Sequence, residues 1–284
     1  MASGTLYVVA TPIGNLADLS PRARDVLASV QLVAAEDTRH TRQLLQAFGI
    51  ATPLTSLHEH NEAEKSAGLV ERLAQGDSVA LVSDAGTPLI SDPGFDLIAA
   101  ARARGIAVVA VPGPCAAIAA LSVAGLPTDR FTFEGFLPAK AAARRSQLQA
   151  LTSEARTLVF YEAPHRLAEA LEDMASVLGA ERAATVSREL TKRFETTYHG
   201  TLAELAEAAQ RDENMSRGEL VIVVSGSSVT PRDAATRQPQ TLDAEQLLRA
   251  LLDELSPAQA AKVAARVTGV KRSVLYDLAI RQVK

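Results

Sequence analysis

Cysteine is nearly absent from the sequence, since Cys115 is the only one among 284 residues. A single thiol can build neither an intrachain disulfide framework nor a zinc site of cysteine thiolates. Long apolar runs are absent too, because the stretch "LIAAARARGIAVVAVP" is interrupted by Arg102, Arg104 and Gly105. A membrane span needs about 20 consecutive, mostly apolar residues, so the sequence predicts no contact with the membrane.

The N-terminus and the overall charge also lack distinctive features. The segment "MASGTLYVVATPIGN" has no basic stretch followed by a long apolar one, so we predict no signal peptide and a cytoplasmic protein. Charged residues make up 22% of the chain and the formal net charge is −4, so positive charge is not in excess. Binding to nucleic acid would therefore require a local basic patch.

Short apolar runs alternate with longer helical patterns along most of the chain. The run "SVALV" is continuously apolar, as expected for a strand of a parallel sheet that is covered on both faces. The alternation predicts an α/β fold with two α/β domains. We place the first domain in residues 1–127. The second, whose strands are richer in Thr, Phe and Tyr, occupies residues 128–228, where we expect a mixed sheet.

The last part of the sequence has a different character. Residues 229–241 are polar and contain two prolines, which predicts a linker. Residues 242–284 predict a small basic helical segment of three short helices, and the turn "TGVKRS" before the third resembles a helix-turn-helix. From residue 256 onward six basic residues oppose Asp277 alone, a net charge of +5, so we predict that Lys271 and Arg272 contact RNA.

The loop "SDAGTPLISDPG", residues 83–94, directly follows the apolar run "SVALV". In an open parallel sheet, ligands bind beyond the carboxyl ends of the strands. Gly86 permits a positive φ or a close backbone approach, and Pro88 holds Thr87 in an extended conformation. The loop therefore predicts a rigid ligand site that presents main-chain groups. The alternative is an ordinary connection in which Asp92 and its following proline cap the next helix.

Two more loops rich in glycine and proline, "ATPIGN" and "VPGPCAA", follow other predicted strands of the same sheet. None of the three loops has the GxGxxG or GxxxxGK[ST] spacing of a phosphate-binding loop, and none contains lysine. This pattern favours a ligand that is held by main-chain atoms and apolar walls.

A set of ordered motifs carries a resemblance to a known family: "ATPIGNLADLS", "AEDTRHT", "HEHN", "SDAGTPLISDPG", "PGPCA", "EGFLP", "FYEAPHR" and "SRELTK". Together they resemble the ribosomal RNA small-subunit methyltransferase I family of the tetrapyrrole methylase superfamily, from about residue 5 to residue 226. The resemblance implies a homodimeric enzyme with S-adenosylmethionine in the cleft between its two α/β domains. It also implies methyl transfer to the ribose 2′-hydroxyl of a cytidine in the decoding region of 16S ribosomal RNA, with the assembled small subunit as substrate.

The resemblance also assigns residues to the cofactor. The superfamily's Gly-Gly-Asp-Pro loop falls on residues 85–88, its Pro-Gly-x-x-Ala turn on residues 112–116, and "FYEAP" supplies Tyr161. The predicted cofactor-binding residues are Pro12, Ser83, Asp84, Ala85, Gly86, Thr87, Ile90, Cys115, Ala116 and Tyr161. The superfamily's first loop, Gly-x-Gly-Pro-Gly-Asp, is replaced by "ATPIGN", which argues against a tetrapyrrole as methyl acceptor.

Methyl transfer from a sulfonium is an in-line displacement that depends on positioning and needs no metal. A ribose hydroxyl is a weak nucleophile, so a nearby base could assist it. We favour Asp37 over Glu36 as that base, with Arg39 available to hold a phosphate. Glu162 and Glu189 are further candidates. The alternative is that Glu36 and Asp37 only cap the helix that begins near Thr38.

Three more residues invite a chemical interpretation. His58 and His60 in "HEHN" have the spacing of two metal ligands but no third ligand, so we expect substrate contact, or a helix cap by Asn61, and no metal. We interpret Cys115 as a small packing residue beside the cofactor rather than a nucleophile.

Two basic groups are candidates for contact with RNA phosphates. Lys140, Arg144 and Arg145 have no acidic neighbour in the sequence until Glu154, and a solvated helix face is the alternative. Arg188 and Lys192 lie in the mixed-charge motif "SRELTKR", which could equally form an interdomain ion-pair network.

Other functions are compatible with parts of the sequence. A tetrapyrrole or protein methyltransferase of the same superfamily would share the cofactor loops, and a non-catalytic ribosome-assembly factor would use the fold only to bind RNA. The basic groups argue against a tetrapyrrole or protein methyltransferase. Three rigid loops that converge on one cleft argue against a non-catalytic assembly factor. A nicotinamide-dependent oxidoreductase lacks its glycine fingerprint here.

Overall fold

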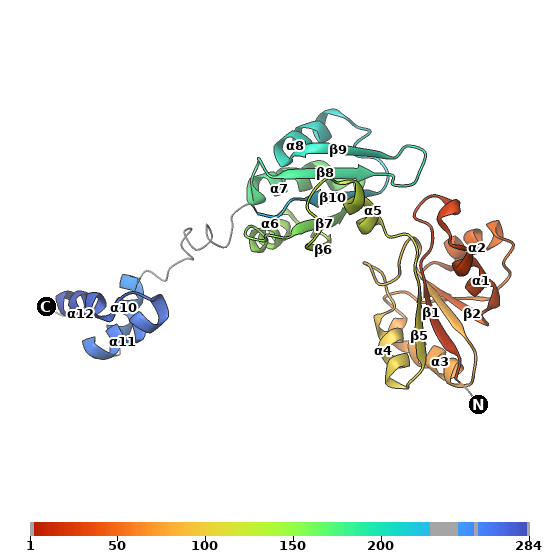
Figure 1. Cartoon of the computed structure of the whole chain (residues 1–284), viewed down its shortest axis with the longest axis horizontal. Coiled ribbons are helices and arrows are strands. Elements are labelled where there is room, and N and C mark those ends of the chain that lie inside the picture. The colour runs from red at the N-terminus through yellow and green to blue at the C-terminus, as the bar shows by residue number, and fades with distance from the viewer. Residues whose placement is uncertain (1–2, 228–243, 253–254, 283–284) are drawn as a thin grey trace. The chain divides into compact units, whose positions relative to one another are not determined.

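The computed structural model describes residues 3–227, 244–252 and 255–282 (Figure 1). Two compact units are present, Met1–Ser227 and Ser228–Lys284. The first unit contains two five-stranded sheets and the second a group of helices. The linker predicted for residues 229–241 lies outside the described residues.

The first sheet is entirely parallel, in the order β3-β2-β4-β1-β5. Its strands are β1 (Thr5–Val9), β2 (Leu32–Ala35), β3 (Leu54–Ser56), β4 (Val79–Val82) and β5 (Ala107–Val111). Helices α1 (Pro21–Ser29), α2 (Thr38–Ala47), α3 (Glu62–Ala74) and α4 (Phe95–Ala103) connect them. All residues of β2 and β4 are buried, and separate apolar clusters around Leu97 and Leu27 cover the sheet. The predicted doubly covered parallel sheet is confirmed.

The second sheet is mixed, as predicted, in the order β6-β7-β10-β8-β9. Its strands are β6 (Phe131–Phe136), β7 (Thr157–Glu162), β8 (Ala183–Arg188), β9 (Thr196–Thr201) and β10 (Leu220–Val224). Only β6 and β7 pair in parallel, and the other neighbours are antiparallel. Helices α6 (Ala141–Ala150), α7 (Leu167–Leu178) and α8 (Leu202–Arg211) contribute to a core with buried Leu148, Phe160 and Leu167. The short 3-10 helices η1 (Leu16–Asp18) and η2 (Pro164–Arg166) lie in loops.

Helix α5 (Ala116–Val123) packs on the second sheet, although the predicted domain boundary assigns it to the first. Its residues Ala117, Ala120 and Leu121 share an apolar cluster with Val159 of β7 and Val223 of β10. The chain thus changes sheet between β5 and α5, before the predicted boundary at residues 127 and 128. The segment "AAIAALSV" is apolar on every side, so its pattern could not indicate which sheet it covers.

The C-terminal unit contains the three predicted helices, α10 (Ala244–Leu252), α11 (Pro257–Thr268) and α12 (Arg272–Gln282). Ser256 begins α11 with a capping box to Gln259, and Gly269, at a φ of 72°, ends it. Leu248, Ala264 and Leu275 belong to its own small core. Among the residues that the structure describes, no helix is long and apolar enough to cross a membrane.

Candidate active site

Three loops leave the carboxyl ends of β1, β4 and β5 and bind one another. The Thr11 backbone N–H donates to the Gly86 carbonyl at 2.9 Å, and the Gly86 N–H donates to the Thr11 carbonyl at 3.1 Å. The Thr87 hydroxyl donates to the Pro114 carbonyl at 2.9 Å. Both main-chain groups of Gly86 therefore tie the loops together. That other residues of the loop present main-chain groups to a ligand stays a prediction.

Strained backbone is concentrated in two loops. Leu89 and Ser91 have φ values of 74° and 69°, and Glu189 and Thr191, after β8, have values of 50° and 66°. A residue other than glycine whose backbone is held in this left-handed region destabilises the fold by about 1–3 kcal/mol, and such residues cluster at functional sites. The surrounding contacts thus hold both loops in conformations that an isolated chain would avoid.

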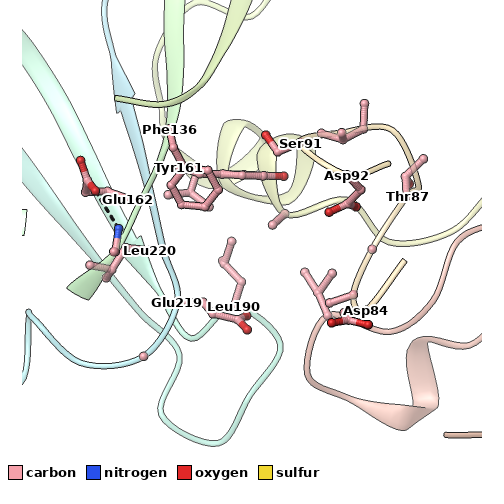
Figure 2. A pocket seen from close by; sticks show the side chains of 18 of the residues that line it. Asp84, Thr87, Ser91, Asp92, Phe136, Tyr161, Glu162, Leu190, Glu219 and Leu220 are labelled. Atoms are coloured by element: carbon pink, nitrogen blue, oxygen red, sulfur yellow. Dashed lines mark hydrogen bonds between the residues drawn. The ribbon is translucent and has the colours of Figure 1, made fainter. Parts of the chain in front are cut away.

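These two loops face each other across a cavity of about 430 Å³ (Figure 2). The first domain contributes Ile13, Glu36, Asp84, Ala85, Gly86, Thr87, Ile90, Ser91 and Asp92, and α5 begins with the lining residue Ala116. The second domain contributes Phe136, Tyr161, Glu162, Ala163, Pro164, Leu190, Gly218, Glu219, Leu220 and Val221. This size lies within the usual range for small-molecule sites, roughly 300–1,000 Å³.

Most of the predicted cofactor-binding residues lie in the wall of this cavity: Asp84, Ala85, Gly86, Thr87, Ile90, Ala116 and Tyr161. Pro12, Ser83 and Cys115 do not line it, and their contact with the cofactor stays a prediction. Ile13 rather than Pro12 supplies the side chain from the first loop, and Ser83 is buried behind the loop that it begins. Cys115 is the N-cap residue of α5 and packs in an apolar cluster.

Sequence reasoning missed much of the second domain's wall, notably Leu190 and residues 218–221. Leu190 lies in the quoted motif "SRELTK", but nothing in β10 marks it as part of a site. The sequence shows only that residue 218 is a glycine. The structure adds that the φ of Gly218 is 76° and that a Cβ there would lie 2.1 Å from Glu189 Oε1. Only glycine permits that approach.

The cavity wall is acidic. Among its described residues five are acidic and none is basic: Glu36, Asp84, Asp92, Glu162 and Glu219. Burial, together with the negative charges of Glu36 and Asp84, raises the pKa of Asp92 to about 6. The Ser83 side chain acts in the opposite direction and lowers this pKa. Burial, with the Asp84 charge beside it, also raises the pKa of Glu36. Such a wall favours a cationic ligand and repels phosphate.

Tyr161 forms part of the facing wall. Its hydroxyl accepts a hydrogen bond from the Ala117 N–H at 3.2 Å, and its ring packs edge-on against Phe133 and Phe136 at centroid distances of 4.9 and 5.6 Å. Burial raises the pKa of Tyr161, so the hydroxyl is neutral. Figure 2 shows it directed toward the side of the cavity that carries Asp92.

Comparison with known proteins places this architecture in a family. The sequence matches the Tetrapyrrole (Corrin/Porphyrin) Methylases over residues 5–206 and the RsmI C-terminal HTH domain over residues 238–282. It is 57% identical over 284 residues to Ribosomal RNA small subunit methyltransferase I of Pseudomonas aeruginosa, covering 99% of both chains. The chain belongs to the tetrapyrrole methylase family. Within it, the chain is a member of the ribosomal RNA small subunit methyltransferase I family.

Further relatives of this methylase agree with that assignment. Ribosomal RNA small subunit methyltransferase I of Vibrio cholerae is 51% identical over 271 residues, which cover 95% of this chain and 92% of the relative. The crystal structure of uroporphyrin-III C-methyltransferase from Thermus thermophilus complexed with S-adenyl homocysteine has a TM-score of 0.55 at 18% identity, and covers 78% of this chain and 97% of that one. The structural likeness confirms the predicted fold of two α/β domains.

Asp37, the favoured candidate for the catalytic base of this methylase, does not line the cavity, and its role as a base stays a prediction. Asp37 is the N-cap residue of α2, and its carboxylate accepts from the Arg39 N–H at 2.7 Å and from Arg39 Nη2 at 2.6 Å. These hydrogen bonds hold the pKa of Asp37 well below its usual range. The helix-cap alternative is confirmed for Asp37. Arg39 is bound to that same carboxylate, and its contact with a phosphate stays a prediction.

Two other candidate bases are occupied by partners. Glu162 accepts from the Ala163 N–H at 2.8 Å and pairs with Arg166 Nε at 3.1 Å. Glu189 does not line the cavity; it accepts from Lys192 Nζ at 2.9 Å and from the Glu219 N–H at 3.1 Å. Both carboxylates therefore position the loops of the second domain.

The "HEHN" motif forms a local cluster. The His58 N–H donates to Asn61 Oδ1 at 2.9 Å, and His58 Nε2 lies 3.0 Å from Asn61 Nδ2. Asn61 occupies the N-cap position of α3, but its side chain makes no capping hydrogen bond, contrary to the predicted cap. Within the described part of the chain, no group of three or more His, Cys, Asp or Glu residues could hold a metal ion.

The prediction that Arg144 contacts RNA is wrong. Its side chain is only 2% exposed, and Nε binds Asp173 Oδ2 of α7 at 2.6 Å. Arg145, 62% exposed, binds Asp173 Oδ1 at 2.5 Å, and Lys140 is exposed. The sequence could not show that Asp173, distant along the chain, neutralises Arg144.

The second basic group consists partly of ion pairs. Lys192 Nζ lies 2.9 Å from Glu189 Oε1 and 3.2 Å from Glu219 Oε2, so these ion pairs lie within the second domain and not, as the alternative predicts, between the domains. Arg188 Nε donates to the Arg217 carbonyl at 3.3 Å. In the C-terminal unit, Lys271 and Arg272 are both exposed at the start of α12. The contact of Lys271 and Arg272 with RNA stays a prediction.

Proposed function

We propose that this methylase transfers the methyl group of S-adenosylmethionine to the ribose 2′-hydroxyl of a cytidine in the decoding region of 16S ribosomal RNA. The observation that carries the proposal is the 57% identity, over 99% of both chains, to a curated ribosomal RNA small subunit methyltransferase. The match to this relative extends over the C-terminal helices. The structurally similar tetrapyrrole enzymes match only 78% of this chain. The alternatives of tetrapyrrole and protein side-chain acceptors have no comparable support.

The cavity fits S-adenosylmethionine. The cofactor supplies a methyl group on a positively charged sulfur. Glu162 and Glu219 are paired with Arg166 and Lys192, but Glu36, Asp84 and Asp92 form no ion pair among the described residues, and these three carboxylates suit a positive charge. Ile13, Ile90 and Leu190 offer apolar walls for its uncharged parts. Asp84, Ala85, Thr87, Ala116 and Tyr161 are the residues that would hold it. A nicotinamide dinucleotide would instead bring a pyrophosphate into an acidic wall.

The relatives and the exposed basic residues of the C-terminal unit support ribosomal RNA as the substrate. The C-terminal unit presents exposed Lys271 and Arg272, and the resemblance to the family implies a homodimer that acts on the assembled small subunit in the cytoplasm. A non-catalytic assembly factor would have no use for strained loops around a cavity of cofactor size.

Removal of the two charges at the start of α12 tests the RNA contact. K271A/R272A should weaken binding to small-subunit RNA and lower the slope of log affinity against log salt by about 2, since each phosphate contact contributes about one. S-adenosylmethionine affinity should not change, because its cavity lies in the first unit. Filter binding at several salt concentrations measures the slope.

The control removes two exposed arginines at the end of α4. R102A/R104A makes the same change in net charge, and Arg104 only pairs with exposed Glu71. An equal loss of RNA affinity in both variants would show that overall charge, and not the face of α12, governs binding.

Mapping of ribose methylation tests the reaction itself. We expect 16S ribosomal RNA from cells that lack the gene to lose one 2′-O-methylcytidine in the decoding region, and purified enzyme with S-adenosylmethionine to restore it on small subunits. Mass spectrometry of nuclease fragments locates the mark. A methyl group found on a base, or on another RNA, would replace this proposal with that acceptor.

A further inference from the structure

We propose that Asp92 is the catalytic base, which takes the proton of the acceptor hydroxyl during methyl transfer. This inference rests on the proposed function, since it takes the acceptor to be a hydroxyl, whose proton must leave when the methyl group is bound. Asp92 lies in the cavity wall at the end of the strained loop of the first domain. Figure 2 shows its carboxylate directed into the space between the two walls, opposite Leu190 and Tyr161.

The backbone fixes the position of Asp92 from both sides. Ser91, at a φ of 69°, precedes it, and Pro93 follows it. A residue before proline is restricted to extended conformations. Gly94, at a φ of 130°, then begins α4, where its N–H donates to the buried Glu62 at 2.9 Å. A carboxylate on such a rigid segment meets the positional demand of proton transfer.

The other first-domain carboxylates already serve neighbouring backbone groups. Asp84 Oδ1 accepts from the Asp37 N–H at 2.9 Å, and Glu36 is bound by the backbone of Asp84. Among the described residues only the Ser83 side chain stabilises the Asp92 carboxylate, and its hydroxyl also donates to the Ala85 carbonyl at 3.4 Å. Asp92 therefore keeps free oxygen lone pairs for a proton from a ligand in the cavity.

The chemistry balances without a further reactant. The acceptor oxygen forms its bond to the methyl carbon, the electron pair of the broken carbon–sulfur bond stays on sulfur, and the hydroxyl proton passes to an Asp92 oxygen. The proton then leaves to water. Glu36 and Asp84 act on this step through their charges, which make Asp92 a stronger proton acceptor than an isolated aspartate.

The groups that face Asp92 define its pH dependence. Glu36 follows β2, Asp84 follows β4, the Ser83 hydroxyl is a neutral donor, and the neutral Tyr161 lies on β7. Since burial raises the pKa of Asp92 in the free enzyme to about 6, kcat/KM for methylation should rise tenfold per pH unit below pH 6 and level off above it.

Three variants separate the roles. D92N should reduce the plateau rate by about 100-fold or more, the usual contribution of a general base, and remove the acid limb. E36Q should shift that limb to lower pH, because it removes a negative charge beside Asp92. D96N is the matched control: Asp96 is exposed on the first turn of α4 and outside the cavity, so its profile should match the wild type.

A second measurement needs neither cofactor nor RNA. Because the folded state raises the pKa of Asp92 above its unfolded value, the wild-type carboxyl favours folding most at low pH, and this contribution is lost as pH rises through about 6. The melting temperature of D92N should therefore exceed that of the wild type at pH 7.5, and the difference should shrink toward pH 4. D96N should show no such trend.

The outcomes are distinct. Three results together support Asp92 as the base: the loss of the acid limb of the pH profile in D92N, the shift of that limb to lower pH in E36Q, and a melting temperature of D92N that exceeds the wild-type value at pH 7.5 but not at pH 4. A D92N enzyme that methylates at the wild-type rate with the same pH profile would overturn this inference and leave the proposed function intact. A wild-type enzyme that transfers no methyl group to ribosomal RNA ribose would overturn both.

Discussion

Gly86→Val should raise the dissociation constant for S-adenosylmethionine by at least about 100-fold, which corresponds to about 2.7 kcal/mol. Gly86 has a φ of +85°, and a Cβ at that position would lie 3.2 Å from Ile13 Cγ2. Backbone strain of about 1–3 kcal/mol and crowding of similar size would push the loop into the cavity or break its two bonds to Thr11. Calorimetric titration of the purified variant measures the change.

A second glycine provides the control for this experiment. Gly105 has a φ of +70°, but a Cβ there would meet nothing within 4 Å. Gly105→Val therefore imposes similar backbone strain at the end of α4, away from the cavity, and should lower stability without changing cofactor affinity. If folded Gly86→Val binds the cofactor as tightly as the wild type, the loop does not form the cofactor site.

Arg144→Ala should lower the free energy of unfolding by about 3–5 kcal/mol, the usual cost of removing one partner from a buried ion pair. The substitution leaves the Asp173 carboxylate, which is 4% exposed, with the partly solvated Arg145 alone. Urea denaturation followed by circular dichroism measures the loss. Burial alone would raise the pKa of Asp173, but hydrogen bonds from Arg145 and Arg144 lower it. This stabilisation is therefore present at neutral pH and lost in acid.

Arg145→Ala is the matched variant for the exposed partner. Its guanidinium is 62% exposed, so its removal should cost no more than about 1 kcal/mol, since exposed ion pairs contribute little. RNA affinity of Arg145→Ala then tests the phosphate contact without the stability defect of Arg144→Ala. Equal stability losses in the two variants would mean that Arg144 is not the structural member of the pair.

The local features of this fold follow from local sequence. "SVALV" predicts a buried parallel strand and Ser20-Pro21 predict the start of α1, where Ser20 accepts from the Ala23 N–H. Asp37 caps α2 through a residue only two positions away, and the sequence offered this alternative. Short-range geometry of this kind depends on few residues, so patterns can express it.

Long-range contacts account for most of the errors. Arg144 is buried because Asp173 meets it from another helix, and α5 leaves the first sheet because its alanines fit the second. Leu190 and β10 enter the cavity wall through the order of the second sheet, in which β10 lies between β7 and β8. Asp92 belongs to the loop "SDAGTPLISDPG", but its raised pKa follows from burial and from the charges of Glu36 and Asp84, which the tertiary fold brings together.

A crystal structure of the protein grown with S-adenosylhomocysteine is the most direct test of the central claim, that the acidic cavity between the two α/β domains is the cofactor site. We expect its electron density between residues 84–92 of the first domain and Tyr161, Leu190 and Val221 of the second. Density at another surface, with this cavity empty at saturating ligand, would contradict the account.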